Sequence, residues 1–123
     1  MFENTSAARQ RHQRFVERVV LSRVVWGLKG ADGWAATTST ADGTRGREVL
    51  PFWSDRGSAA LCVKESWANY EPAEIPLDIF LQRWLPRMAV ERCLAGTNWS
   101  AQLAGHELEP DALRDELARQ SGH

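Results

Sequence analysis

The residues able to do chemistry are few and scattered in this sequence. His12 lies among arginines, His106 precedes acidic residues, and His123 is the last residue. A tetrahedral zinc site needs three or four ligands at compatible spacing, and neither a C-x-x-C nor an H-E-x-x-H pattern occurs. Cys62 and Cys93 both lie in apolar helical contexts, which favours buried thiols over a disulfide. The sequence therefore indicates no metal and no cofactor.

Motifs for nucleophilic catalysis and for phosphate binding are also missing. No serine lies in a G-x-S-x-G pattern, and neither cysteine lies in an obviously electropositive turn. Two glycine pairs, at 30/33 and 43/46, lie between candidate strands, whereas a phosphate-binding loop would open a helix and carry a lysine. Glycine and aspartate supply the positive φ that hairpins need, so these pairs predict turns. No catalytic residue is indicated, although an enzyme with an unrecognised site stays open.

Aromatic side chains are the remaining candidates for function. The chain has six tryptophans, at positions 26, 34, 53, 67, 84 and 99. Trp53, Trp67 and Tyr70 flank loops at the ends of elements, where amphipathic rings often line a groove or anchor an interface. Glu71 follows directly and adds an acidic rim. We therefore predict a binding site at Trp53, Trp67, Tyr70 and Glu71; the alternative is that these rings plug the ends of a sheet.

The elements that must position these residues begin with a helix and a hairpin. Apolar residues recur at helical spacing over 6–22, with arginines on the opposite face, which predicts an amphipathic helix. The segments 24–28, 34–39 and 48–53 read as strands separated by glycine-rich turns. Pro51 cannot donate a ladder hydrogen bond and so suggests an edge or the end of pairing. This half of the chain predicts a three-stranded antiparallel meander.

The second half of the chain reads as more helical. A helix over 78–85 has a core face of Phe80, Leu81 and Trp84, and we expect Trp84 to be buried. Pro86 would remove an intrahelical hydrogen bond, which predicts a stop or a kink there. Further elements are expected as a short helix capped by Ser54 or Asp55 over 59–63, a helical piece over 88–93, strands over 94–99 and 105–108, and a final helix from Pro110.

Size and composition indicate one domain. The chain has 123 residues, of which 43% are hydrophobic and 25% charged, both ordinary values for a globular fold. We predict a single domain over 1–123, frayed at 1–5 and 120–123. Its expected class is α+β, an antiparallel β-meander of about three to five strands with amphipathic helices packed on one face. No apolar run of about 18 residues occurs, so a cytoplasmic protein is expected.

Charge is balanced over the chain and segregated at its ends. The formal net charge is −1, which gives no global attraction to nucleic acid or to an anionic membrane. Residues 1–23 carry five arginines against two glutamates, whereas residues 107–123 carry five carboxylates against two arginines. The two ends are electrostatically complementary, which favours a solvated helix face over a nucleic-acid site. Specific nucleic-acid binding is therefore not expected.

An ordered series of segments carries a resemblance to a known family. These are Val25-Trp26-Gly27-Leu28, Asp32-Gly33-Trp34-Ala35, Val49-Leu50-Pro51-Phe52-Trp53, Trp67-Ala68-Asn69-Tyr70-Glu71-Pro72 and Ile75 through Pro86. Over roughly residues 10–95 the chain resembles the bacterial domain of unknown function family 2750. The resemblance implies a small bacterial cytoplasmic α+β protein and supplies no catalytic residues.

Three functions follow from these observations. The first is a non-catalytic module that binds a protein or peptide partner through the aromatic loops. The second is a small-molecule or nucleotide-binding enzyme with an unrecognised site, which would need a deep pocket with perturbed carboxylates or histidines. The third is weak nucleic-acid binding through the basic N-terminal helix.

Overall fold

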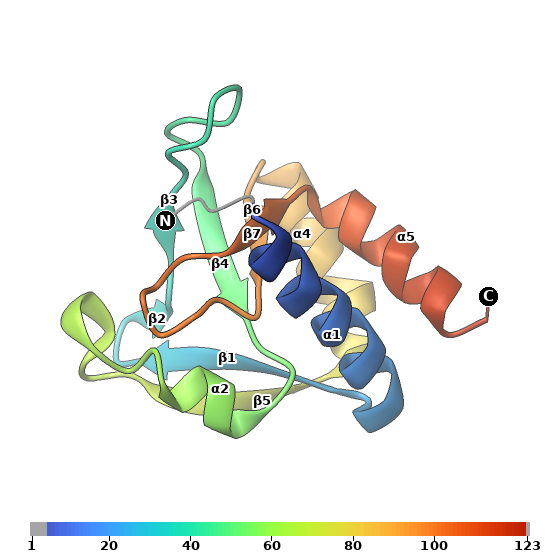
Figure 1. Cartoon of the computed structure of the whole chain (residues 1–123), viewed down its shortest axis with the longest axis horizontal. Coiled ribbons are helices and arrows are strands. Elements are labelled where there is room, and N and C mark those ends of the chain that lie inside the picture. The colour runs from blue at the N-terminus through green and yellow to red at the C-terminus, as the bar shows by residue number, and fades with distance from the viewer. Residues whose placement is uncertain (1–4, 123) are drawn as a thin grey trace.

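The computed structural model describes residues 5–122, and within them two small sheets cross at the centre (Figure 1). One sheet has the order β2-β1-β5, formed by Gly33–Trp34, Val24–Gly30 and Glu71–Pro76. The other has the order β3-β4-β6-β7, formed by Thr37–Thr38, Glu48–Phe52, Leu94–Thr97 and His106–Leu108. A bridge joins them, because the backbones of Trp26 and Trp53 exchange two hydrogen bonds of 2.8 and 2.7 Å. The sheets therefore form one connected unit.

Helices cover these sheets from separate sides. The helical segments are α1 (Ser6–Ser22), α2 (Arg56–Ala60), the 3-10 turn η1 (Glu65–Trp67), α3 (Leu77–Ile79), the π turn η2 (Phe80–Trp84), α4 (Leu85–Val90) and α5 (Pro110–Gln120). In Figure 1, α1, α4 and α5 gather beside the larger sheet, and α2 lies near the smaller one. The arrangement confirms the predicted α+β class with mostly antiparallel pairing.

The first helix forms as its sequence predicts. The Thr5 hydroxyl accepts a hydrogen bond from the backbone N–H of Ala8 and so caps the helix start. The buried face of α1 carries Ala8, His12, Phe15, Val16 and Val19. Arg23 adopts a left-handed conformation after the last turn and ends the helix. Of the ends expected to fray, residues 1–4 and 123 lie outside the described part, while α5 continues to Gln120.

The strands pair differently from a single meander. The hairpin between β1 and β2 is present but only two residue pairs long. The long antiparallel partner of β1 is β5, which pairs along it from Val24 opposite Pro76 to Lys29 opposite Glu71. The long partner of β4 is β6, in parallel. Turn signals identify local hairpins, but they carry no information on partners that lie more than 40 residues away in the chain.

Pro51 lies in a central strand rather than at a sheet edge. It pairs with Gly96 of β6 on one side of β4. On the other side, β3 pairs only as far as Val49. The residues before β3 no longer pair with β4, since the N–H of Ala35 donates to the carbonyl of Leu28 in β1. The proline thus lies where the ladder on that side has already ended, as its missing N–H requires.

The helix predicted over 78–85 does not stop at Pro86. It runs from Leu77 to Val90 through the π turn, in which the Leu85 N–H bonds to the carbonyl of Phe80. A proline clashes with the carbonyl four residues earlier, and the wider turn accommodates it without ending the helix. Phe80 is fully buried as expected. The expectation for Trp84 is corrected: its ring is only half-buried, since one side of η2 faces a surface pocket.

Strand β5 forms one edge of the smaller sheet. In its antiparallel register, Glu71, Ala73 and Ile75 lie at the positions that bond to β1, and the Leu77 N–H continues this series to the carbonyl of Arg23. At the alternate positions, the backbone groups of β5 point away from β1. Two of these, residues 72 and 76, are prolines, so this edge exposes few backbone donors.

Candidate functional site

The aromatic residues predicted to form a binding site do not gather on the surface. Trp53 is fully buried, and its indole N–H donates to the carbonyl of Trp99 at 3.0 Å. Trp67 is 5% exposed, and its ring lies 6.5 Å from that of Trp99. Tyr70 is half-buried and Glu71 is exposed. Of the three predicted rings, two belong to the core, and only Tyr70 offers more than an edge to a partner.

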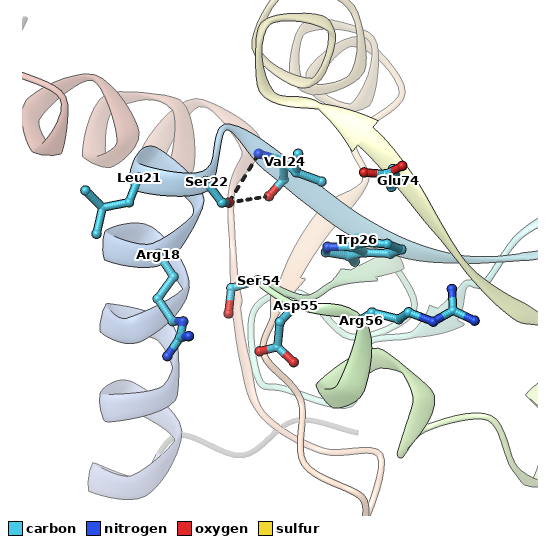
Figure 2. Close-up of a pocket in the computed structure, with 9 residues that line it drawn as sticks. All are labelled: Arg18, Leu21, Ser22, Val24, Trp26, Ser54, Asp55, Arg56 and Glu74. Atoms are coloured by element: carbon cyan, nitrogen blue, oxygen red, sulfur yellow. Dashed lines mark hydrogen bonds between the residues drawn. The ribbon is translucent and has the colours of Figure 1, made fainter.

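A sizeable pocket lies elsewhere, between the end of α1, the smaller sheet and the start of α2 (Figure 2). Its volume is about 700 Å³. The lining residues come from α1, β1, β5 and α2 and from the segment before α2: Arg18, Leu21, Ser22, Val24, Trp26, Ser54, Asp55, Arg56 and Glu74. Figure 2 shows Arg18 pointing from α1 toward the hollow and Leu21 pointing away from it at the rim, with Trp26 and Glu74 on the opposite side. We call this hollow the Trp26 pocket.

Trp26 is half-buried because of strand geometry. Successive side chains of β1 alternate between faces, so Val25 enters the core while Trp26 points to the opposite face. Glu74 lies directly across the ladder from it, and the guanidinium of Arg56 lies 6.0 Å from the ring centroid. Leu21 at the rim is 84% exposed. An amphipathic ring in a hollow, with an exposed leucine on the rim, is typical of recognition surfaces.

The wall between α1 and α2 is fixed by a buried amide. Asn98 accepts a hydrogen bond from the Ser54 backbone N–H at 2.8 Å and donates to the Ser54 hydroxyl at 3.1 Å. The same amide donates to the carbonyl of Arg11 in α1, and the Arg11 side chain returns a bond to the Asn98 carbonyl. The backbone of Asn98 has a φ of 46°, a left-handed conformation that asparagine tolerates better than most residues. Asn98 therefore sets the distance between two sides of the Trp26 pocket.

The polar groups of the Trp26 pocket are suited to binding rather than to reaction. Both oxygens of Asp55 are occupied, accepting from the backbone N–H and the hydroxyl of Ser58 at 2.8 and 3.0 Å. The Ser54 hydroxyl accepts from Asn98, and the described residues that line the hollow include no histidine or cysteine to act as its base. Arg18 and Arg56 have no ion pair to any residue within 5–122. These guanidiniums remain available to a partner.

A second polar group, not foreseen from the sequence, links three elements. His12 of α1 lies with Nδ1 2.8 Å from the Thr97 hydroxyl of β6 and Nε2 2.8 Å from a carboxylate oxygen of Glu116 in α5. The His106 ring contacts that of His12 in a tilted arrangement, with centroids 4.5 Å apart and an interplanar angle of 43°. Helical spacing with Ala8 and residues 15, 16 and 19 was the signal that places His12 on the buried face.

This hydroxyl, imidazole and carboxylate series resembles a catalytic triad in connectivity but not in access. Thr97 is fully buried and His12 nearly so, so no substrate reaches the hydroxyl. Burial, followed by the neighbouring His12, lowers the pKa of His106, and burial raises the pKa of Glu107. The group joins α1, β6 and α5 and is part of the structure rather than a reaction centre.

The two cysteines and the other possible metal ligands also form no reaction centre within the described residues. Cys62 and Cys93 are free and buried, as predicted, and burial raises the pKa of both thiols to about 11. Within residues 5–122, no group of three or more His, Cys, Asp or Glu side chains is placed to hold a metal ion; His123 lies outside this range. No described helix is both long and apolar enough to cross a bilayer.

Comparison with known proteins places the chain in a family without assigning it an activity. No curated protein and no solved structure matches it. A family model described as a protein of unknown function, DUF2750, matches residues 12–117. The match extends beyond the segments that carry the resemblance in sequence and includes β6, β7 and most of α5. The chain therefore belongs to the DUF2750 family.

Proposed function

We propose that this protein is a non-catalytic binding module, and that the Trp26 pocket receives a protein or peptide partner. The observation that carries the proposal is the half-buried indole of Trp26 in a hollow of about 700 Å³, with Leu21 exposed at its rim. The volume lies within the usual range of ligand sites, and aromatic anchors in buried pockets commonly dominate binding energy.

Charged side chains form a polar rim around the Trp26 ring. Arg18 and Arg56 supply two guanidiniums that form no ion pair with residues 5–122, and Glu74 supplies a carboxylate opposite Trp26. Rim charges of this kind affect association rate and specificity more than affinity. Tyr70 and Glu71, the accessible members of the set predicted from sequence, lie toward the far end of the smaller sheet and are a secondary candidate surface.

We also propose that the protein works in the bacterial cytoplasm. Its two cysteines are free and buried, which suits a reducing compartment, and the family resemblance in sequence is to bacterial proteins. Pull-down of the full chain from a bacterium encoding it, with mass spectrometry, is the experiment that would identify the partner.

The chain offers a matched pair of variants for this test. Leu21 and Val90 are both 84% exposed, but only Leu21 lines the Trp26 pocket. We expect Leu21→Ser to lose the captured partner and Val90→Ser to retain it, with both variants folding normally because exposed positions tolerate substitution. Retention of the partner by Leu21→Ser, or equal loss in both variants, would contradict the proposal.

A further inference from the structure

A second pocket lies between β2, β4 and the helical segment from η2 to α4, and it shares no residue with the Trp26 pocket. Its volume is about 390 Å³, within the usual range for small-molecule sites. The rings of Trp34 and Trp84, with Leu50 and Met88, form its apolar walls, and Arg83 and Arg87 supply its cationic groups. We call it the Trp34 pocket.

The aromatic walls are held in fixed positions. The rings of Trp34 and Trp84 meet edge to face, with centroids 4.8 Å apart and an interplanar angle of 85°. Trp34 also lies directly on the backbone of β1, because a Cβ added at Gly27 would come within 2.9 Å of the ring. The ammonium of Lys29 lies 5.5 Å from the same ring. Two rigid indoles beside a flexible thioether form a surface that fits a flat, apolar body.

One of the two arginines that line the Trp34 pocket has no ion-pair partner among residues 5–122. Arg87 is paired, since its Nε lies 3.2 Å from a carboxylate oxygen of Glu91, which also lines the pocket. Arg83 makes no hydrogen bond or ion pair with any residue in the described range 5–122. It is carried, with Trp84, on the π turn, and such turns are frequent at functional sites. Among the charged residues that line the pocket, the surplus is therefore one guanidinium, whose paired N–H groups match a single carboxylate.

We propose that the Trp34 pocket binds a small planar aromatic monoanion, with its ring against Trp34 and Trp84 and its carboxylate on Arg83. This inference does not depend on the proposed function, because the two pockets have separate walls. It makes the protein a small-molecule binder at a site distinct from that of any protein partner.

Three probes that share one ring separate the aromatic contribution from that of charge. Indole-3-acetate carries a carboxylate, indole carries no charge, and tryptamine carries an ammonium. Binding to the full chain is followed by the NMR shifts of the Trp34 and Trp84 indole N–H groups. We expect indole-3-acetate to bind about tenfold more tightly than indole, as one partly exposed charge-assisted hydrogen bond gives, and tryptamine to bind more weakly than indole.

Variants then assign the charge to one residue. Arg83→Gln should reduce the preference for indole-3-acetate over indole to about twofold or less, because the neutral amide retains only an uncharged hydrogen bond. Arg114→Gln, which removes an exposed arginine from α5 outside the pocket, should leave the preference unchanged. Absence of shifts at both indoles up to about 10 mM indole-3-acetate would overturn the site. Equal affinities for the three probes, or equal loss of preference in Arg114→Gln, would overturn the ligand class.

Discussion

The hydroxyl of Thr97 offers a direct test of the buried polar group that joins α1, β6 and α5. Thr97→Val replaces this hydroxyl with a methyl group of nearly the same size in a fully buried position. The Nδ1 atom of His12, which lies 2.8 Å from the hydroxyl, then loses its partner, while Nε2 keeps its contact with Glu116. The perturbation therefore removes one hydrogen bond without opening a cavity.

The magnitude follows from the cost of leaving a buried polar atom unpaired. We expect Thr97→Val to lower the free energy of unfolding by about 1–3 kcal/mol. Thr97→Ser is the matched control, because it keeps the hydroxyl and removes one buried methyl group, at a cost of about 1 kcal/mol. In a His12→Gln background the added cost of Thr97→Val should fall, since the pair it disrupts is already gone; a coupling of at least about 0.5 kcal/mol is expected.

Urea denaturation at pH 7.5, followed by tryptophan fluorescence and circular dichroism, measures these differences. Coincident transitions by the two probes would show that the two-state treatment holds. If Thr97→Val proved no more destabilising than Thr97→Ser, and the two substitutions at 97 and 12 were additive, the hydrogen bond would contribute nothing and the reasoning would be refuted.

Four further outcomes are expected. The pKa of His106 in the folded state lies below its ordinary 6.5, so the unfolded chain binds the proton more tightly. The free energy of unfolding should therefore fall as pH drops below about 6.5. His106→Gln should flatten this dependence in urea melts recorded at several pH values. Gly96→Ala should destabilise strongly, because its Cβ would meet a buried indole at 2.5 Å, whereas Gly57→Ala in α2 should stabilise by about 0.5–1 kcal/mol in the same assay. Phe80→Ala should cost about 3–5 kcal/mol and Trp84→Ala less, since that ring is half-buried; the reverse order in thermal melts would contradict the packing. Fluorescence anisotropy should detect no sub-micromolar binding of a defined DNA or RNA at physiological salt, because the chain is balanced in charge.

Local signals in the sequence identified much of the secondary structure. The apolar spacing of α1, Asp55 as the cap of α2, and Pro110 at the start of α5 each act within a few residues. The pairings of β1 with β5 and of β4 with β6 depend on segments that are distant in the chain. No residue near either strand specifies such a partner, so the topology was beyond prediction from one sequence.

The candidate site shows the same division. Both faces of β1 carry apolar residues, so nothing in the sequence tells which of Val25 and Trp26 the rest of the chain covers. Trp53 and Trp67 flank loops, as predicted, but the loops fold inward over a core that includes Cys62 and Trp99. Position next to a loop therefore does not measure exposure. For His12 the spacing was informative, but its neighbouring arginines suggested a solvated face.

The prolines at the outer edge of β5 limit how this molecule can be contacted. A strand from another chain adds to a sheet by alternating donors and acceptors, and Pro72 and Pro76 remove two of the three donors that β5 would present. Main-chain templating along this edge is thereby blocked, which protects the folded chain from edge-to-edge polymerisation. A partner at the neighbouring Trp26 pocket must then be recognised through side chains. Replacing both prolines would restore backbone donors along this edge, where a strand of another copy of the chain could then pair.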